Sequence, residues 1–357
     1  MIQHSEWIFG PFMLALVALV TWAFWMLPQW TRPGIYFGVT VAPDFRKTPE
    51  AQRLLRRYRL EAMIHVAIAF AMILASALPR YQFFFIVGAI WLAVGPLTAF
   101  VEAHKRVQRH AVQAVTVREA VLEPRSTRPP GGWIVQVGPF AILLATGIFL
   151  HFHWDEIPAR FPVHWGIDGQ PNGWSNRTPM GVYGPLLLGV LISACMWLTA
   201  NTLLRSARIV DRARPVLVLH DFAYRVGLFL LIIELFLAVV FSCVGLLPLA
   251  GVMPVMIVTI LMLPAIFFLI VWLNKGRAHH IERSGEATPE AAAGDGTPDE
   301  CWKFGMLYFN PDDAALWVEK RAGIGYTMNF AHVSAWIIMA LILMVPILGL
   351  LAALHNR

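Results

Sequence analysis

Charged residues are scarce in this 357-residue chain, where Asp, Glu, Lys and Arg make up 14%, against about 25% in an ordinary soluble protein. The three cysteines, at positions 195, 243 and 301, are too few and too widely spaced for a disulfide framework or a CxxC metal site. No P-loop, GxSxG or dinucleotide-binding fingerprint is present. These absences argue against a soluble globular protein and against the enzyme classes that such motifs mark.

Long apolar runs dominate what is present: 58% of the residues are hydrophobic and the mean hydropathy is +0.61. Several runs reach the roughly twenty residues that a helix needs to cross a bilayer. They are continuous rather than alternating, which argues against a membrane β-barrel. We therefore predict an all-α integral membrane protein, a bundle of about eight transmembrane helices. The predicted spans are residues 7–28, 60–78, 81–101, 133–153, 183–204, 226–247, 251–273 and 334–353.

The basic residues are distributed unevenly among the connections between these spans. All but four of the 28 Lys and Arg residues fall in the segments 29–59, 102–132, 205–225 and 274–333. Because basic residues accumulate in cytoplasmic loops, we predict a bacterial inner-membrane protein with both termini outside. The net charge of +6 is then explained by contact with the anionic inner leaflet, and we predict no nucleic-acid partner.

Composition divides the chain into six segments. Residues 274–300 are rich in Ala, Gly, Glu and Pro and predict a disordered linker. Residues 301–330 hold clustered aromatics and two turn sequences, which predict a small hairpin-like cytoplasmic module that packs on the bundle and is available to a cytoplasmic protein partner. The predicted segments are four helices (1–153), an ordered outer loop (154–182), three helices (183–273), the linker (274–300), the module (301–333) and a last helix (334–357).

The outer loop contains the sequence FPVHWGIDGQPNGWSN, residues 161–176. Glycine and proline fix unusual backbone conformations, and tryptophan is typical of a membrane–water interface. This pattern predicts a rigid, interfacial loop. Its candidate structural or ligand-contacting residues are Pro162, His164, Trp165, Gly169, Pro171, Asn172, Gly173, Trp174 and Arg177.

Imidazole and carboxylate side chains occur close together in the sequence of the outer loop and just before it. This grouping makes a divalent metal ion the single cofactor candidate. The candidate ligands are His151, His153, His164 and Asp168, residue types that suit zinc. Their spacing matches no recognised zinc signature. Three interpretations stay open: a metal site, a hydrogen-bonded histidine that fixes the loop, and a surface that binds an extracellular peptide or small ligand.

Three polar residues lie within or beside the predicted spans. Glu234 is near the middle of its span, where a charge costs at least about 2.5–3.5 kcal/mol, so it is a functional-site hypothesis by default. A neutral carboxyl bonded to a neighbouring helix and a proton or ion pathway are both open. Glu61 and His65 stand at i and i+4, which predicts a local pair on one helix face.

The pattern Pro162-x-His164-Trp165, then Gly169-x-Pro171-Asn172-Gly173-Trp174, resembles a domain of unknown function found in SdpI-family membrane proteins. Arg177 stands about where that family has a basic residue. The segment 302–330 is similar to a second small uncharacterised domain that often accompanies the first. SdpI is a multipass immunity protein that also signals by holding a repressor at the membrane, and its own C-terminal region is replaced here by the small module.

The resemblance implies a non-enzymatic sensor or immunity factor against a membrane-active ligand. In that hypothesis the outer loop contacts the ligand and the module transmits its occupancy. A proton-coupled transporter that uses Glu234 is the first alternative, and a membrane metalloenzyme with an outer His/Asp site is the second.

Overall fold

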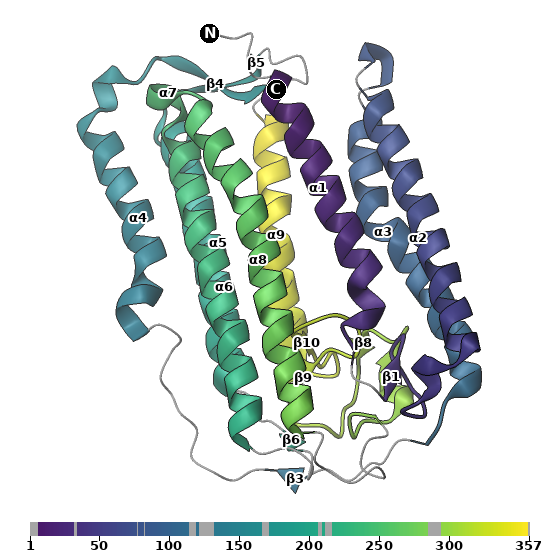
Figure 1. Ribbon diagram of the computed structural model, residues 1–357. Coiled ribbons are helices and arrows are strands. Elements are labelled where there is room, and N and C mark those ends of the chain that lie inside the picture. The colour runs from purple at the N-terminus through teal and green to yellow at the C-terminus, as the bar shows by residue number, and fades with distance from the viewer. Residues whose placement is uncertain are drawn as a thin grey trace.

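The protein is described here from a computed structural model covering residues 6–31, 34–76, 78–81, 83–113, 119–120, 132–165, 171–205, 209–210, 216–284 and 294–355. Over these residues the chain forms a bundle of long helices with small β-hairpins at its two ends (Figure 1). The helices are α1 (Glu6–Met26), α2 (Pro49–Ala75), α3 (Phe84–Val107), α4 (Gly132–Phe152), α5 (Pro179–Arg205), α6 (Val216–Gly245), the short α7 (Leu247–Ala250), α8 (Met253–Ser284) and α9 (Val333–His355).

Each of the eight predicted spans lies on one of the long helices, so the all-α multipass prediction is confirmed. Within the described residues α2, α3, α5, α6 and α8 are long and apolar enough to cross a membrane. Shorter described apolar stretches lie on α1, α4 and α9. The second predicted span starts at residue 60, within α2, which begins earlier at Pro49. Thr48 is its N-cap, and the Thr48 hydroxyl accepts a hydrogen bond from the Ala51 amide at 3.2 Å.

The strands form five antiparallel pairs among the described residues. The pairs are β1 (Ile35–Tyr36) with β2 (Val39–Thr40), β3 (Glu119–Ala120) with β6 (Ile209–Val210), β4 (Arg160–Trp165) with β5 (Pro171–Asn176), β7 (Trp302–Lys303) with β8 (Leu307–Tyr308), and β9 (Trp317–Glu319) with β10 (Tyr326–Met328). The β4–β5 hairpin lies at one end of the bundle, where α1 begins and α9 ends, and the other pairs lie at the opposite end (Figure 1).

We call these two ends the hairpin end and the module end. The described parts of the four basic connections identified in the sequence lie at the module end, where the helices that they join begin or end. The helices form two packed groups: α2 with α3, and α4, α5, α6, α8 and α9 together. Helix α1 contacts α2, α3 and α8, and its Trp22 ring lies 4.8 Å from the ring of Phe267 on α8.

The prediction that residues 274–300 form a disordered linker is wrong at both ends of this range. Helix α8 continues through Ser284, and residues 294–300 are held in place by the side chains of Asp295, Thr297 and Asp299. The module therefore comprises residues 294–330. We keep the name module for this range.

The module packs against both helix groups. Its Ala322 belongs to an apolar cluster with the β1–β2 hairpin and with Tyr58 on α2 and Phe100 on α3. Its Trp317 and Met328 belong to a second cluster formed with α5, α6, α8 and α9. The prediction that this segment packs on the bundle is confirmed.

Candidate functional site

The β4–β5 hairpin covers the hairpin end of the bundle, next to the first turn of α5 and the short α7 (Figure 1). Its register pairs Pro162 with Trp174 and Trp165 with Pro171, and a β-bulge interrupts the ladder at His164, which faces Gly173. The predicted rigid loop is thus a two-stranded hairpin. Gly169 and Asp168 lie outside the described residues, as do the side chains of His164 and Asn172.

An apolar cluster attaches the hairpin to the helices beneath it. Phe161 on β4 and Ile157, just before it, are buried. They pack with Leu150 on α4 and with Val182 and Leu186 on α5. Hairpin and helix ends therefore share one core, and a shift of the hairpin has to move α4 or α5.

Arg177, the basic residue that follows the motif, joins the hairpin to the turn that precedes it. Its Nη1 donates to the carbonyl oxygens of Trp154, Asp155 and Ile157 at 3.1–3.3 Å, and its own amide donates to the carbonyl of Ala159 at 2.9 Å. One guanidinium thus bonds three carbonyls of the short 3₁₀ turn and its end, of which the Trp154 carbonyl also accepts from the Ile157 amide at 3.2 Å.

We expect Arg177→Lys to loosen the hairpin, because the lysine side chain is one bond shorter and its ammonium stops short of the position from which Nη1 donates to the three carbonyls. The loss should be about 1.5–3 kcal/mol in local stability, the range for hydrogen bonds to charged groups. Hydrogen–deuterium exchange of residues 154–176 measures it in lipid nanodiscs. Arg160→Lys, at an exposed arginine of the same hairpin, is the control, and equal exchange in the two variants would contradict the assignment.

The outward face of the hairpin presents an aromatic and cationic surface. The Arg160 guanidinium lies 5.2 Å from the ring centre of Trp174, which is 38% exposed. Such a pair is typical of a surface that meets lipid headgroups or an amphipathic ligand.

The two metal candidates whose side chains are described, His151 and His153, lie at the hairpin end, on the last turn of α4 and directly after it. His151 is exposed, while His153 stacks on Phe149 at 4.0 Å and its Nδ1 lies 2.9 Å from the Phe149 carbonyl oxygen. Among the described residues no three His, Cys, Asp or Glu side chains are placed to hold a metal ion. A site that includes His164 or Asp168 stays a prediction.

At the module end, Arg321 is the centre of a buried polar cluster that sequence reasoning missed. The side chain is 1% exposed and forms a fork with Asp295, in which Nε and Nη2 donate to the two carboxylate oxygens at 2.9 Å. Its Nη1 donates to Asp299 at 2.6 Å and to the Gly38 carbonyl at 3.0 Å. Although burial opposes the charge, the two carboxylates raise the pKa of Arg321 above its ordinary value.

The same cluster ties the module to the first connection of the chain. Asp299 accepts hydrogen bonds from the Thr40 hydroxyl at 2.7 Å and from the Thr40 amide at 3.1 Å. Thr40 and Asp299 are separated by 259 residues in sequence. The signal in the sequence was an arginine within an aromatic segment, preceded by two aspartates among turn-forming residues.

A close backbone contact lies beside this cluster. Phe37 and Gly38 both have positive φ, 47° and 76°, and form the two-residue turn between β1 and β2. A Cβ atom on Gly38 would overlap the backbone of Gly305 in the module. The carbonyl of Phe37 lies 2.8 Å from Nδ1 of the buried His104 on α3.

Trp317 connects the module to α5. Its indole Nε1 donates to the Thr202 hydroxyl near the last turn of α5, at 3.2 Å. Helix α5 begins directly after β5, so one continuous helix runs from the hairpin to this bond (Figure 1). Helix α5 is therefore one of the elements that join the hairpin end to the module end.

The structure gives Glu61 and His65 partners other than each other. The Glu61 carboxylate accepts from Arg57 at 2.9 Å and from Arg106 on α3 at 3.0 Å. The Nε2 atom of His65 lies 3.2 Å from the Thr98 hydroxyl, also on α3. The predicted local pair is wrong because two guanidinium groups are within reach of the carboxylate, and both residues instead join α2 to α3.

Glu234 lies on α6 and is 2% exposed. Its Oε1 has no hydrogen-bond partner among the residues that the structure describes. The polar residue predicted within the span is therefore a buried carboxyl group in the structure. The functional role of Glu234 stays a prediction.

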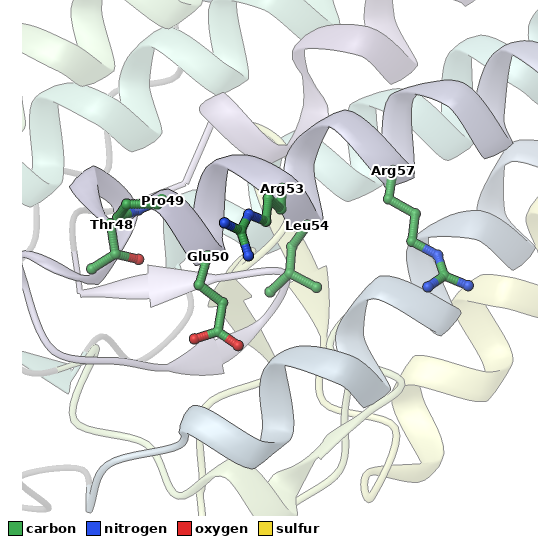
Figure 2. Close-up of a pocket in the computed structure, with 6 residues that line it drawn as sticks. All are labelled: Thr48, Pro49, Glu50, Arg53, Leu54 and Arg57. Carbon is green, nitrogen blue, oxygen red and sulfur yellow. The ribbon is translucent and has the colours of Figure 1, made fainter.

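A groove of about 590 Å³ follows the first turns of α2 (Figure 2). It is lined by Thr48, Pro49, Glu50, Arg53, Leu54 and Arg57. The carboxylate and both guanidinium groups are exposed to solvent, so the groove is an open surface of mixed charge. It fits the predicted contact of this basic connection with anionic headgroups but shows no enclosed ligand site.

Two family models match the chain. Residues 141–190 are similar to domain of unknown function DUF1648, and residues 311–336 are similar to family of unknown function DUF5808. The first covers the part of α4 nearest the hairpin, the whole hairpin sequence and the start of α5. The second covers the later part of the module and the first turn of α9. No curated protein and no solved structure matches the chain. The matched segments are thus the hairpin and the module, the two ends that α5 connects.

Proposed function

We propose that this membrane protein is a non-enzymatic sensor related to the SdpI type. The β4–β5 hairpin contacts a membrane-active peptide, and the module transmits its occupancy to a cytoplasmic protein. The observation that carries the proposal is the single helix α5, which starts at the hairpin and ends on Trp317 of the module. The two segments that match family models are the two that this helix joins.

Rigid attachment at both ends supports this role. Arg177 and the buried Phe161 hold the hairpin on α4 and α5, so force on the hairpin reaches the helices. At the module end, the Arg321 cluster holds the module on the β1–β2 hairpin while Trp317 holds it on α5. A displacement of α5 therefore alters the contacts that the module makes with each of the two helix groups.

The ligand class follows from the hairpin surface. An exposed tryptophan beside an arginine at a membrane interface suits an amphipathic peptide that partitions into headgroups. The similarity of the motif to SdpI-family domains favours a toxic secreted peptide, and protection of the cell would be the physiological outcome.

The test compares transcript profiles of cells exposed to a panel of cationic amphipathic peptides, with and without the gene. We expect a peptide-dependent response that Trp174→Ala weakens by removing the exposed contact. Trp317→Phe should preserve peptide binding to the purified protein but reduce the response, because it removes the bond to Thr202, worth about 1 kcal/mol.

The matched control is Trp133→Phe, at an exposed tryptophan on α4, which should leave both binding and response unchanged. An unaltered response in Trp317→Phe would contradict the relay. The absence of any peptide-dependent response or binding would contradict the sensor proposal itself.

A further inference from the structure

Buried polar side chains with unpaired atoms are concentrated in the three helices beneath the hairpin. They are Gln136 on α4, Ser193 on α5, and Glu234 and Ser242 on α6, each at most 6% exposed. Gln136 Oε1, Glu234 Oε1 and the two serine hydroxyls have no hydrogen-bond partner within the described part of the chain. Several threonines of these helices do bond a carbonyl one turn back, as Thr146 and Thr199 do.

Side-chain contacts show which residues of the three helices lie at the same level along the bundle axis. A Cβ atom on Gly189 of α5 would lie 2.9 Å from the Cβ of Phe241 on α6 and 3.0 Å from Leu143 Cδ2 on α4. These three residues therefore share one level of a common seam. Nearer the hairpin end, Gly245 of α6 makes the same kind of contact with Leu186 of α5.

Helix periodicity then places the polar residues on this seam. Gln136 is seven residues from Leu143 and Glu234 is seven residues from Phe241, so each faces the seam about 10 Å closer to the module end. Helices α4 and α6 run in the same direction, which puts Gln136 and Glu234 at the same height. Helix α5 runs in the opposite direction, and Ser193 is four residues beyond Gly189. Ser193 therefore lies between the level of Gly189 and the level of Gln136 and Glu234 along the bundle axis.

The unpaired atoms of Gln136 and Glu234 are both acceptor oxygens, so neither can satisfy the other without a hydrogen. Glu234 forms no ion pair with a described residue. The described charged and histidine side chains of α4 and α8 are His151 and Lys275, which lie toward the ends of these helices, and α5 has none among its described side chains. On α6 itself, Arg225 is nine residues away and lies over Trp272. A single proton supplies the missing donor and removes the buried charge.

We propose that the α4–α5–α6 seam holds one exchangeable proton on Glu234, with Gln136 Oε1 as its hydrogen-bond acceptor. The hydroxyls of Ser193 and Ser242 lie between this site and the hairpin end and form the route by which the proton exchanges. The site is independent of the proposed sensor function, because none of its four polar residues belongs to the clusters that hold the hairpin and the module.

Infrared spectroscopy of the full-length protein in proteoliposomes tests the site. We expect the carbonyl band of a protonated carboxyl group at neutral pH, shifted by deuterium oxide and lost in Glu234→Gln. Gln136→Leu should move the band to higher frequency, because the carboxyl loses its acceptor. Glu61→Gln is the matched control and should leave the band unchanged, since Glu61 is ionised between two arginines.

The route is tested by the double variant Ser193→Ala, Ser242→Ala, in which deuterium exchange of the band should slow several-fold. Unchanged exchange would overturn the route. A missing band, or a carboxylate band that shifts when sodium is removed, would overturn the proton site. An unshifted band in Gln136→Leu would overturn the role of Gln136.

Discussion

Replacing Arg321 with methionine is expected to release the module from the β1–β2 hairpin. The variant leaves Asp295, whose side chain is 8% exposed, and Asp299 without their shared cation. Removing one partner of a buried ion pair costs about 3–5 kcal/mol, because the remaining charge stays desolvated. Arg321→Lys should fall between wild type and methionine, since an ammonium cannot form the fork with Asp295.

Hydrogen–deuterium exchange of residues 35–40 and 302–308 measures this loss directly. Arg57→Met is the matched control, because Arg57 is 62% exposed and its pair with Glu61 contributes about 1 kcal/mol or less. Adding Asp295→Asn and Asp299→Asn to the methionine variant should restore part of the protection by removing the uncompensated charges. Equal exchange in Arg321→Met and Arg57→Met would contradict the structural role of this cluster.

Gly38→Ala is expected to separate the first connection from the module. Its Cβ would meet the Gly305 backbone, which cannot rotate away as a side chain can, and overpacking of this kind costs about 1–3 kcal/mol. A positive φ adds a second cost of about 1 kcal/mol for a residue with a side chain. Thermal unfolding in detergent and exchange of the β1–β2 hairpin both measure the effect.

Gly325→Ala in the module separates these two contributions. Gly325 also has a positive φ, 100°, but a Cβ there meets no atom within 4 Å. The control variant should therefore show only the conformational cost. If both alanine variants lose the same stability, the close approach of Gly38 to Gly305 is not what holds the two segments together.

The membrane architecture was predictable because it follows from composition and local pattern. Apolar runs of bilayer length mark every long helix, and Thr48-Pro49 marks the start of α2 even though the apolar run begins later. The turn sequences in residues 301–330 likewise predicted a hairpin-like module, which consists of two hairpins with a bridge between Tyr308 and Asn329.

The contacts that join distant segments were not predictable from the sequence read alone. Composition assigned Asp295 and Asp299 to a flexible linker, because nothing local shows that Arg321 and Thr40 satisfy them. Glu61 was paired with its helical neighbour for the same reason, whereas its second arginine comes from α3. No local sequence pattern marked Gln136 or Ser193 as part of a site. Their proximity to Glu234 depends on which residues of three separate helices lie at the same level of the bundle.

The relay between the two ends is the central claim, and amide exchange in a double-variant cycle tests it most directly. Arg177→Lys, Trp317→Phe and their combination would be compared in nanodiscs without any ligand. Because coupling between sites is reciprocal, Arg177→Lys should raise exchange in residues 317–328, and Trp317→Phe should raise it in residues 160–176. The effects of the two changes should be non-additive. Exchange confined in each variant to the end that was changed would contradict a relay through α5.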